Sequence, residues 1–152
     1  MDVLDRPQLS PDTQATLLLC GRFDARAEGT GTAERPLSGA EYNRLAKLLV
    51  AKGRRPADLI AGDLAELADT GLDEARLRTL LHRGMAMALA LERWGRIGIR
   101  VLGRGDPRYP AKLRLRLRSA APHLLFVAGP FELLDAEALC VVGSRDATEA
   151  GL

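Results

Sequence analysis

Apolar residues recur at helical spacing from Ser38 onward. Ser38 and Glu41 have the spacing of a capping box, in which each side chain accepts a hydrogen bond from the other residue's backbone N–H. Apolar residues then follow every three or four positions until Gly53, namely Tyr42, Leu45, Leu48 and Leu49. This pattern predicts a helix between Ser38 and Gly53.

Two more helical regions follow along the chain. One begins near Pro56 and reaches a break at residues 69–71, with apolar positions at Leu59, Ile60, Leu64 and Leu67. The next begins near Asp73, a suitable N-cap, and continues toward Trp94. Gly84 lowers the helix propensity there without ending the predicted helix.

The segments around the first apolar run have the composition of loops. Residues 1–14 are polar and contain two prolines, and residues 24–36 are rich in glycine, alanine, threonine and charge. The run between them, residues 15–20, is too short for its period to distinguish a helix from a strand. Together with the three helical regions, these segments predict a helical N-terminal domain over residues 1–95.

The pattern changes after Gly95. Residues 97–102 alternate like a strand, residues 103–110 are dense in turn residues, and compact apolar runs occupy residues 124–128 and 138–142. Such runs, bounded by proline and glycine, suit strands that are buried on both faces of a parallel sheet. The sequence therefore predicts an α/β protein in which residues 96–152 begin a parallel-sheet domain.

Charge is distributed unevenly along the chain. The 152 residues include 22 Lys and Arg and 20 Asp and Glu, so the net charge is only +2. That sum alone indicates neither a nucleic-acid binder nor a membrane-surface protein. From Glu92 to Arg118, however, nine basic residues stand against two acidic ones, so this segment carries +7.

The chain shows no sign of a membrane or secretory segment. No basic region precedes an apolar stretch at the start, and the longest apolar run, residues 85–91, is shorter than the roughly 20 residues of a membrane span. We therefore expect a soluble, cytoplasmic protein. Cys20 and Cys140 are expected in the core, and neither they nor His82 and His123 have the spacing of a metal site or catalytic relay. The sequence predicts no metal site and no cofactor.

The turn after the last apolar run combines three groups that suit an anion. Gly143 permits close backbone approach, the Ser144 hydroxyl can donate a hydrogen bond, and Arg145 can hold a phosphate with two parallel bonds. Open α/β sheets bind ligands at the carboxyl ends of their strands, where helix dipoles also favour anions. The alternative is that Gly143 only turns the chain while Arg145 is solvated on a loop.

A second candidate is the basic stretch over residues 112–118. Cations alternate with leucines here, so a strand would place four charges on one face: Lys112, Arg114, Arg116 and Arg118. Such a face can follow a phosphate backbone. The alternative is a solvated face above a leucine stripe. The few aromatic residues indicate no base-stacking platform, and a packing role is expected for Trp94, Tyr109, Phe126 and Phe131.

The order of motifs after Trp94 resembles the DNA-processing protein A (DprA/Smf) family. The motifs are Gly98–Leu102, Asp106–Pro110, Pro122–Phe126 and Val141–Arg145, followed by Thr148 and Gly151. The resemblance implies a Rossmann-like domain that binds single-stranded DNA and helps load the RecA recombinase in transformation and recombination, without catalysis. It also implies that Gly143, Ser144 and Arg145 lie in the DNA-binding pocket. A homodimer is implied where the Rossmann-like domain is complete.

Two other classes of protein stay open at this point. One is a Rossmann-like nucleotide-binding enzyme of the phosphoribohydrolase type, although no candidate acid or base follows the turn. The other is a helical protein-interaction module formed by residues 38–95. Because the family's pattern continues through a second glycine-rich turn, we expect this chain to be the N-terminal portion of such a protein, truncated early in the Rossmann-like domain.

Overall fold

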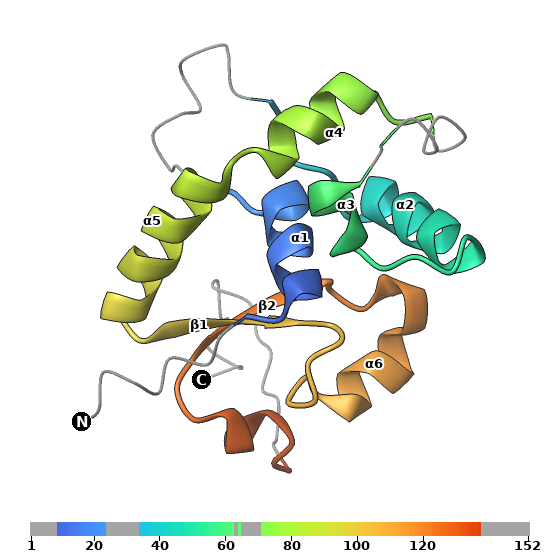
Figure 1. The fold of residues 1–152 in the computed structure, drawn as a ribbon. Coiled ribbons are helices and arrows are strands. Elements are labelled where there is room, and N and C mark those ends of the chain that lie inside the picture. Colours follow the sequence, from blue (N-terminus) through green and yellow to red (C-terminus); the bar gives the residue numbers. More distant parts are fainter. Residues whose placement is uncertain (1–8, 24–33, 63, 65–70, 138–152) are drawn as a thin grey trace, which may run out of the picture.

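The computed structural model describes residues 9–23, 34–62, 64 and 71–137. This part of the chain is mostly helical, with one small sheet below the helices (Figure 1). The helices are α1 (Pro11–Cys20), α2 (Gly39–Ala51), α3 (Asp58–Ala61), α4 (Glu74–Leu81), α5 (Gly84–Arg96) and α6 (Ala111–Leu117). The strands are β1 (Ile99–Gly103) and β2 (Leu124–Ala128), and two 3₁₀ helices are η3 (Arg118–Ala120) and η4 (Phe131–Leu134).

Helix α2 confirms the prediction made from the capping box. The Ser38 hydroxyl accepts from the backbone N–H of Glu41 at 3.3 Å, and the Glu41 carboxylate accepts from the backbone N–H of Ser38 at 2.7 Å. Gly53 follows the helix with a φ of 64°, a conformation that favours glycine. The apolar face of α2 is buried through Tyr42, Leu45 and Leu49.

Helix α1 settles the type of the short apolar run, residues 15–20, which the sequence left open between helix and strand, and it begins before that run. Residues 11–14, expected in a loop, are helical because the Ser10 hydroxyl caps the helix by accepting from the backbone N–H of Thr13 and because Pro11 suits the first turn. The apolar run that follows is almost completely buried. Helix α1 therefore lies at the centre of the molecule, between the other helices and the sheet (Figure 1).

The single helix predicted from Asp73 to Trp94 is wrong, because α4 and α5 are separated at His82 and Arg83. Asp73 does cap α4, as predicted. The break lets the Arg83 guanidinium reach α1, where it donates to the carbonyls of Leu18 and Gly21. In the predicted region after Pro56, the described helix is the short α3, and residues 65–70 lie outside the described residues.

The sheet is antiparallel, so the prediction of a parallel sheet is wrong for the described strands. Strands β1 and β2 confirm two of the expected strand regions, but they pair antiparallel, with Val101 opposite Phe126. A parallel pair needs a covering crossover helix. Helix α6, between the strands, buries no residue completely, so it does not cover the sheet in this way. No parallel pair, and hence no Rossmann sheet, occurs among the described residues, and residues 138–142 lie outside them.

Two groups of apolar side chains form the core, and α1 contributes to both. One fills the space among α1, α2, α3 and α4 and includes Leu19, Leu45 and Leu77. The other joins α1 and α5 to the sheet through Leu17, Ala90 and Val101. The helices and the sheet are thus packed on a shared central helix, which fixes α2 relative to the β1–β2 connection. The proposed domain boundary near residue 95 stays a prediction.

Candidate nucleic-acid interface

The predicted phosphate-binding turn, Gly143, Ser144 and Arg145, lies outside the described residues, as does Cys140. Its role as a DNA contact therefore stays a prediction. Lys112, Arg114, Arg116 and Arg118, the cations of the basic stretch, do lie within the described part of the chain.

The basic stretch is a helix rather than the predicted strand. Residues 111–117 form α6, and Leu, Arg and Lys are good helix formers with no β-branched residue among them. Neighbouring helical residues are about 100° apart, so Lys112 and Arg116 share one side and Arg114 lies on another. All three, and Arg118 after them, are exposed. The cations therefore surround α6 instead of lining one face.

The motif at Asp106–Pro110 has a structural role in positioning α6. The Asp106 carboxylate accepts from the Arg108 guanidinium at 3.0 and 2.9 Å, and hydrogen bonding to Arg108 holds its pKa below the ordinary value. Tyr109 is buried and donates its hydroxyl to the carbonyl of Pro122 at 2.8 Å. These contacts fix the start of α6 against the segment that enters β2.

The C-terminal end of α6 is held by contacts that the sequence did not reveal. Arg118 has a φ of 47°, unusual for a residue with a side chain, and the Arg104 guanidinium donates to its carbonyl. Arg114 donates to the carbonyl of Arg104 at 3.4 Å. Three arginines thus converge at this end. The uneven charge of residues 92–118 was the available signal, but it did not single out Arg104.

The next segment joins this end of α6 to α2. The His123 ring packs on the buried Tyr42 ring with centroids 4.3 Å apart, and the Tyr42 and Thr16 hydroxyls lie 2.7 Å apart. Burial lowers the pKa of His123, and it raises the pKa of Tyr42 to about 12. Neutral, packed side chains of this kind serve as structural contacts.

Of the aromatic side chains expected to pack, Tyr109 is buried and Trp94 and Phe131 are partly buried, whereas Phe126 is half exposed. Trp94 lies between Phe23 and Phe126, with ring centroids 6.3 and 5.0 Å away, and Tyr109 is buried. Phe131 is covered by guanidinium groups, with Arg100 3.7 Å and Arg108 4.8 Å from the ring centroid.

The described residues hold no cluster of three or more His, Cys, Asp or Glu side chains able to bind a metal. Burial raises the pKa of Cys20 to about 12, so its thiol stays protonated near neutral pH and is a poor nucleophile. In this same part of the chain, no helix is both long and apolar enough to cross a membrane.

In the comparison with known families, residues 100–152 are similar to a class of proteins that mediate DNA recombination. The family model that these residues match is described as DNA recombination-mediator protein A. The match begins in β1 and extends over α6, β2 and the Gly143–Arg145 turn, roughly the last third of the chain. It confirms the resemblance to the DNA-processing protein A family. No curated protein and no solved structure matches the chain.

Proposed function

We propose that this chain is a single-stranded-DNA-binding protein of the DNA-processing protein A type, which helps load a RecA-type recombinase in transformation and recombination. The observation that carries the proposal is the match of residues 100–152 to the recombination-mediator family. The matched region includes both cationic candidates, the Gly143–Arg145 turn and α6. The exposed cations of α6 support the proposal because they attract phosphates.

In this proposal Arg145 makes the main phosphate contact, because a guanidinium donates two parallel, charge-assisted hydrogen bonds. Gly143 lets the backbone approach the phosphate, and Ser144 adds a hydroxyl donor. The cations of α6 are a weaker auxiliary surface. Phosphate contacts carry no sequence information, so binding is expected to be independent of DNA sequence.

The proposed role is binding without catalysis and without a cofactor. Its partners are single-stranded DNA and a RecA-type recombinase, and homodimer formation depends on a complete Rossmann-like domain. These assignments follow from the family resemblance rather than from a contact within the described residues.

The proposal is tested by titrating a fluorescent single-stranded oligonucleotide with the chain and with its Arg145→Ala variant. We expect the substitution to weaken binding about tenfold, equally for all sequences, because it removes charge-assisted hydrogen bonds. Arg96→Ala is the control, since Arg96 is an exposed arginine already paired with Glu92 at 2.6 Å. Unchanged affinity in Arg145→Ala would contradict the site, and a folded parent chain that binds no DNA would contradict the function.

A further inference from the structure

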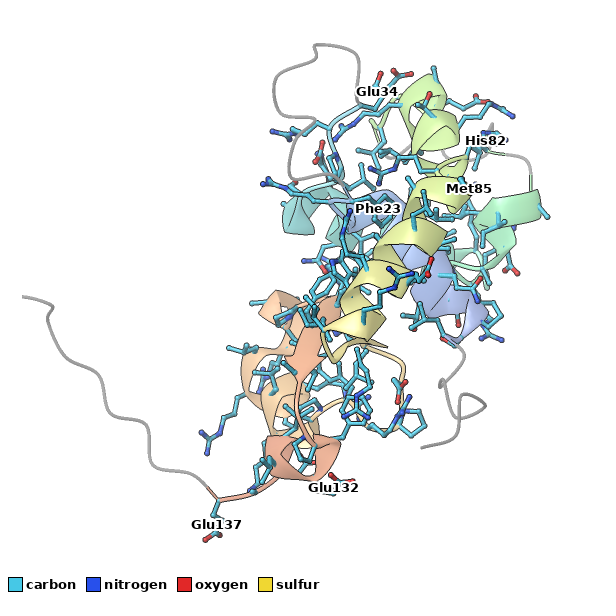
Figure 2. The ribbon with its side chains drawn as sticks, turned by 90° about the vertical axis from the view of Figure 1, so that its left-hand side faces the viewer. Phe23, Glu34, His82, Met85, Glu132 and Glu137 are labelled. Atoms are coloured by element: carbon cyan, nitrogen blue, oxygen red, sulfur yellow. The ribbon has the colours of Figure 1, made fainter. Side chains whose placement is uncertain are left out.

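The basic surface of α6 continues onto α2. Asn43 of α2 donates to the carbonyl of Ser119, in the 3₁₀ helix η3 that follows α6, at 3.0 Å. In both views α2 lies above the C-terminal end of α6 (Figures 1 and 2). Lys47 is one helical turn after Asn43, so it lies on the side of α2 that meets this end. Arg44 is adjacent, and both cations are exposed.

Arg104 adds a cation at this junction. It is half-buried and donates to the carbonyl of Arg118. Burial is the main cause of the lowered pKa of His123, and the positive charge of Arg104 lowers it further. The same charge acts on the buried Tyr42 hydroxyl of α2. The backbone N–H of Arg104 also donates to the carbonyl of His123 at 3.0 Å, so Arg104 adds positive charge next to the residue that packs on Tyr42.

The cations on the two sides of the junction are not neutralised by neighbours. In the part of the chain that the structure describes, Arg44, Lys47, Arg116 and Arg118 form no ion pair with a carboxylate. The acidic residue of α2, Glu41, is instead paired with Arg76 at 2.8 Å and Arg35 at 3.4 Å. The junction therefore keeps its positive charge.

The other end of α6 has different surroundings. Lys112, in its first turn, donates to the backbone carbonyl of Asp135 at 3.4 Å. Figure 2 shows Glu132 and Glu137 at the end of the molecule opposite to Glu34 and His82. The N-terminal end of α6 thus lies near the segment that carries Glu132, Asp135 and Glu137, whose carboxylates offset the nearby cations Arg100 and Arg108. A polyanion would be attracted to the C-terminal end, beside α2.

We propose that the phosphate backbone of single-stranded DNA crosses the α2–α6 junction, where Arg44 and Lys47 of α2, Arg116 of α6 and Arg118 of η3 contact successive phosphates. The inference rests on the proposed function and extends the DNA-binding surface onto the helical part of the chain. The Asn43–Ser119 hydrogen bond and the Tyr42–His123 ring contact hold the two sides of the junction together, so its cations keep their spacing better than cations on a loop that must be ordered on binding. The junction adds affinity and salt dependence without sequence preference.

The test compares two double variants of the full chain that lose the same charge. Arg44→Gln with Lys47→Gln removes the α2 half of the junction. Arg78→Gln with Arg96→Gln is the matched control, because these exposed arginines lie on α4 and α5 and are paired with Glu74 and Glu92. Affinity for a fluorescent single-stranded oligonucleotide is measured over a series of salt concentrations, and circular dichroism checks folding.

We expect the α2 variant to bind about three- to thirtyfold more weakly than the parent at low salt, and the control to bind as the parent does. For the α2 variant, the slope of log affinity against log salt should be smaller in magnitude than that of the parent by about 1.4, because two phosphate contacts are lost and each contact with a single strand contributes about 0.7. Equal affinities and slopes for the α2 variant and the control would overturn the inference. If Arg145→Ala still weakened binding, the proposed function would stand. A folded parent chain that binds no single-stranded DNA would overturn both.

Discussion

Gly103, the last residue of β1, lies against the buried Thr13 of α1. A Cβ atom at position 103 would be 2.2 Å from the Thr13 hydroxyl oxygen and 3.0 Å from its Cβ. Thr13 cannot easily move away, because it is buried and its hydroxyl lies 2.9 Å from that of Ser10, the N-cap of α1. The glycine therefore permits the close approach of the sheet to the central helix.

Gly103→Ala is expected to lower the free energy of unfolding by about 1–3 kcal/mol, because the added methyl group overpacks this contact. Gly105→Ala is the matched control: no atom lies within 4 Å of a Cβ at that position, so its effect should stay within about 0.5 kcal/mol. Urea unfolding of both variants measures the difference. Equal stabilities would show that the contact carries no strain.

The sequence predicts the local roles of single residues better than their distant contacts. Ser38 and Asp73 are helix caps, as predicted, because a cap depends on residues within one turn. In contrast, the sequence places Gly103 in a turn-rich segment and Arg104 in that segment and in the basic segment over residues 92–118, without indicating their contacts. Their neighbours, Thr13 of α1 and His123 before β2, are distant in sequence and become adjacent only through the fold.

Among the helices, α2 is tied to α4 through its capping residue. The Glu41 carboxylate accepts from the Arg76 guanidinium at 2.8 Å and from the backbone N–H of Ser38 at 2.7 Å. Arg76 also donates to the carbonyls of Arg35 and Pro36, so it links α4 to the segment that enters α2. The hydrogen bond from Arg76 is the main cause of the lowered pKa of Glu41, followed by those with Ser38.

This lowered pKa predicts a specific dependence of stability on pH. Because ionised Glu41 is favoured in the folded state, its contribution is present above the ordinary pKa of 4.5 and is lost as the pH falls through and below that value. Glu41→Gln keeps the capping shape but removes the charge. Its deficit in unfolding free energy relative to the parent should therefore be largest near pH 7 and shrink below pH 4.5, as measured by urea unfolding. A deficit independent of pH would contradict this role for the carboxylate.

Elements were predicted from sequence where one period dominated. Helix α2 follows from its helical period, and strand β1 from the alternation of residues 97–102. For residues 112–118 the alternation predicts a strand, and this prediction is wrong. These residues form a helix and its end because Leu, Arg and Lys have high helix propensity. The antiparallel pairing of β1 and β2 depends on the path of the segment between them, which strand composition does not specify.

At the scale of the whole molecule, α1 connects the parts that the proposed DNA path requires. Its buried side chains pack against α2 and α4 on one side and against α5 and the sheet on the other. Helix α2 is held by this core, and the Asn43–Ser119 hydrogen bond and the Tyr42–His123 ring contact link it to the segment that follows α6. The charge excess in residues 92–118 predicts a basic surface from sequence alone. Arg44 and Lys47 could not be assigned to that surface from sequence, because only the fold brings α2 next to the end of α6.

The most direct test of the central claim is the affinity of the chain for single-stranded and double-stranded oligonucleotides of equal length at two salt concentrations. We predict tighter binding to the single strand, and a fall in affinity as salt rises, because phosphate contacts release counterions. Equal or stronger binding to the duplex, or single-strand binding that is insensitive to salt, would contradict the account of this chain as a single-stranded-DNA-binding recombination mediator.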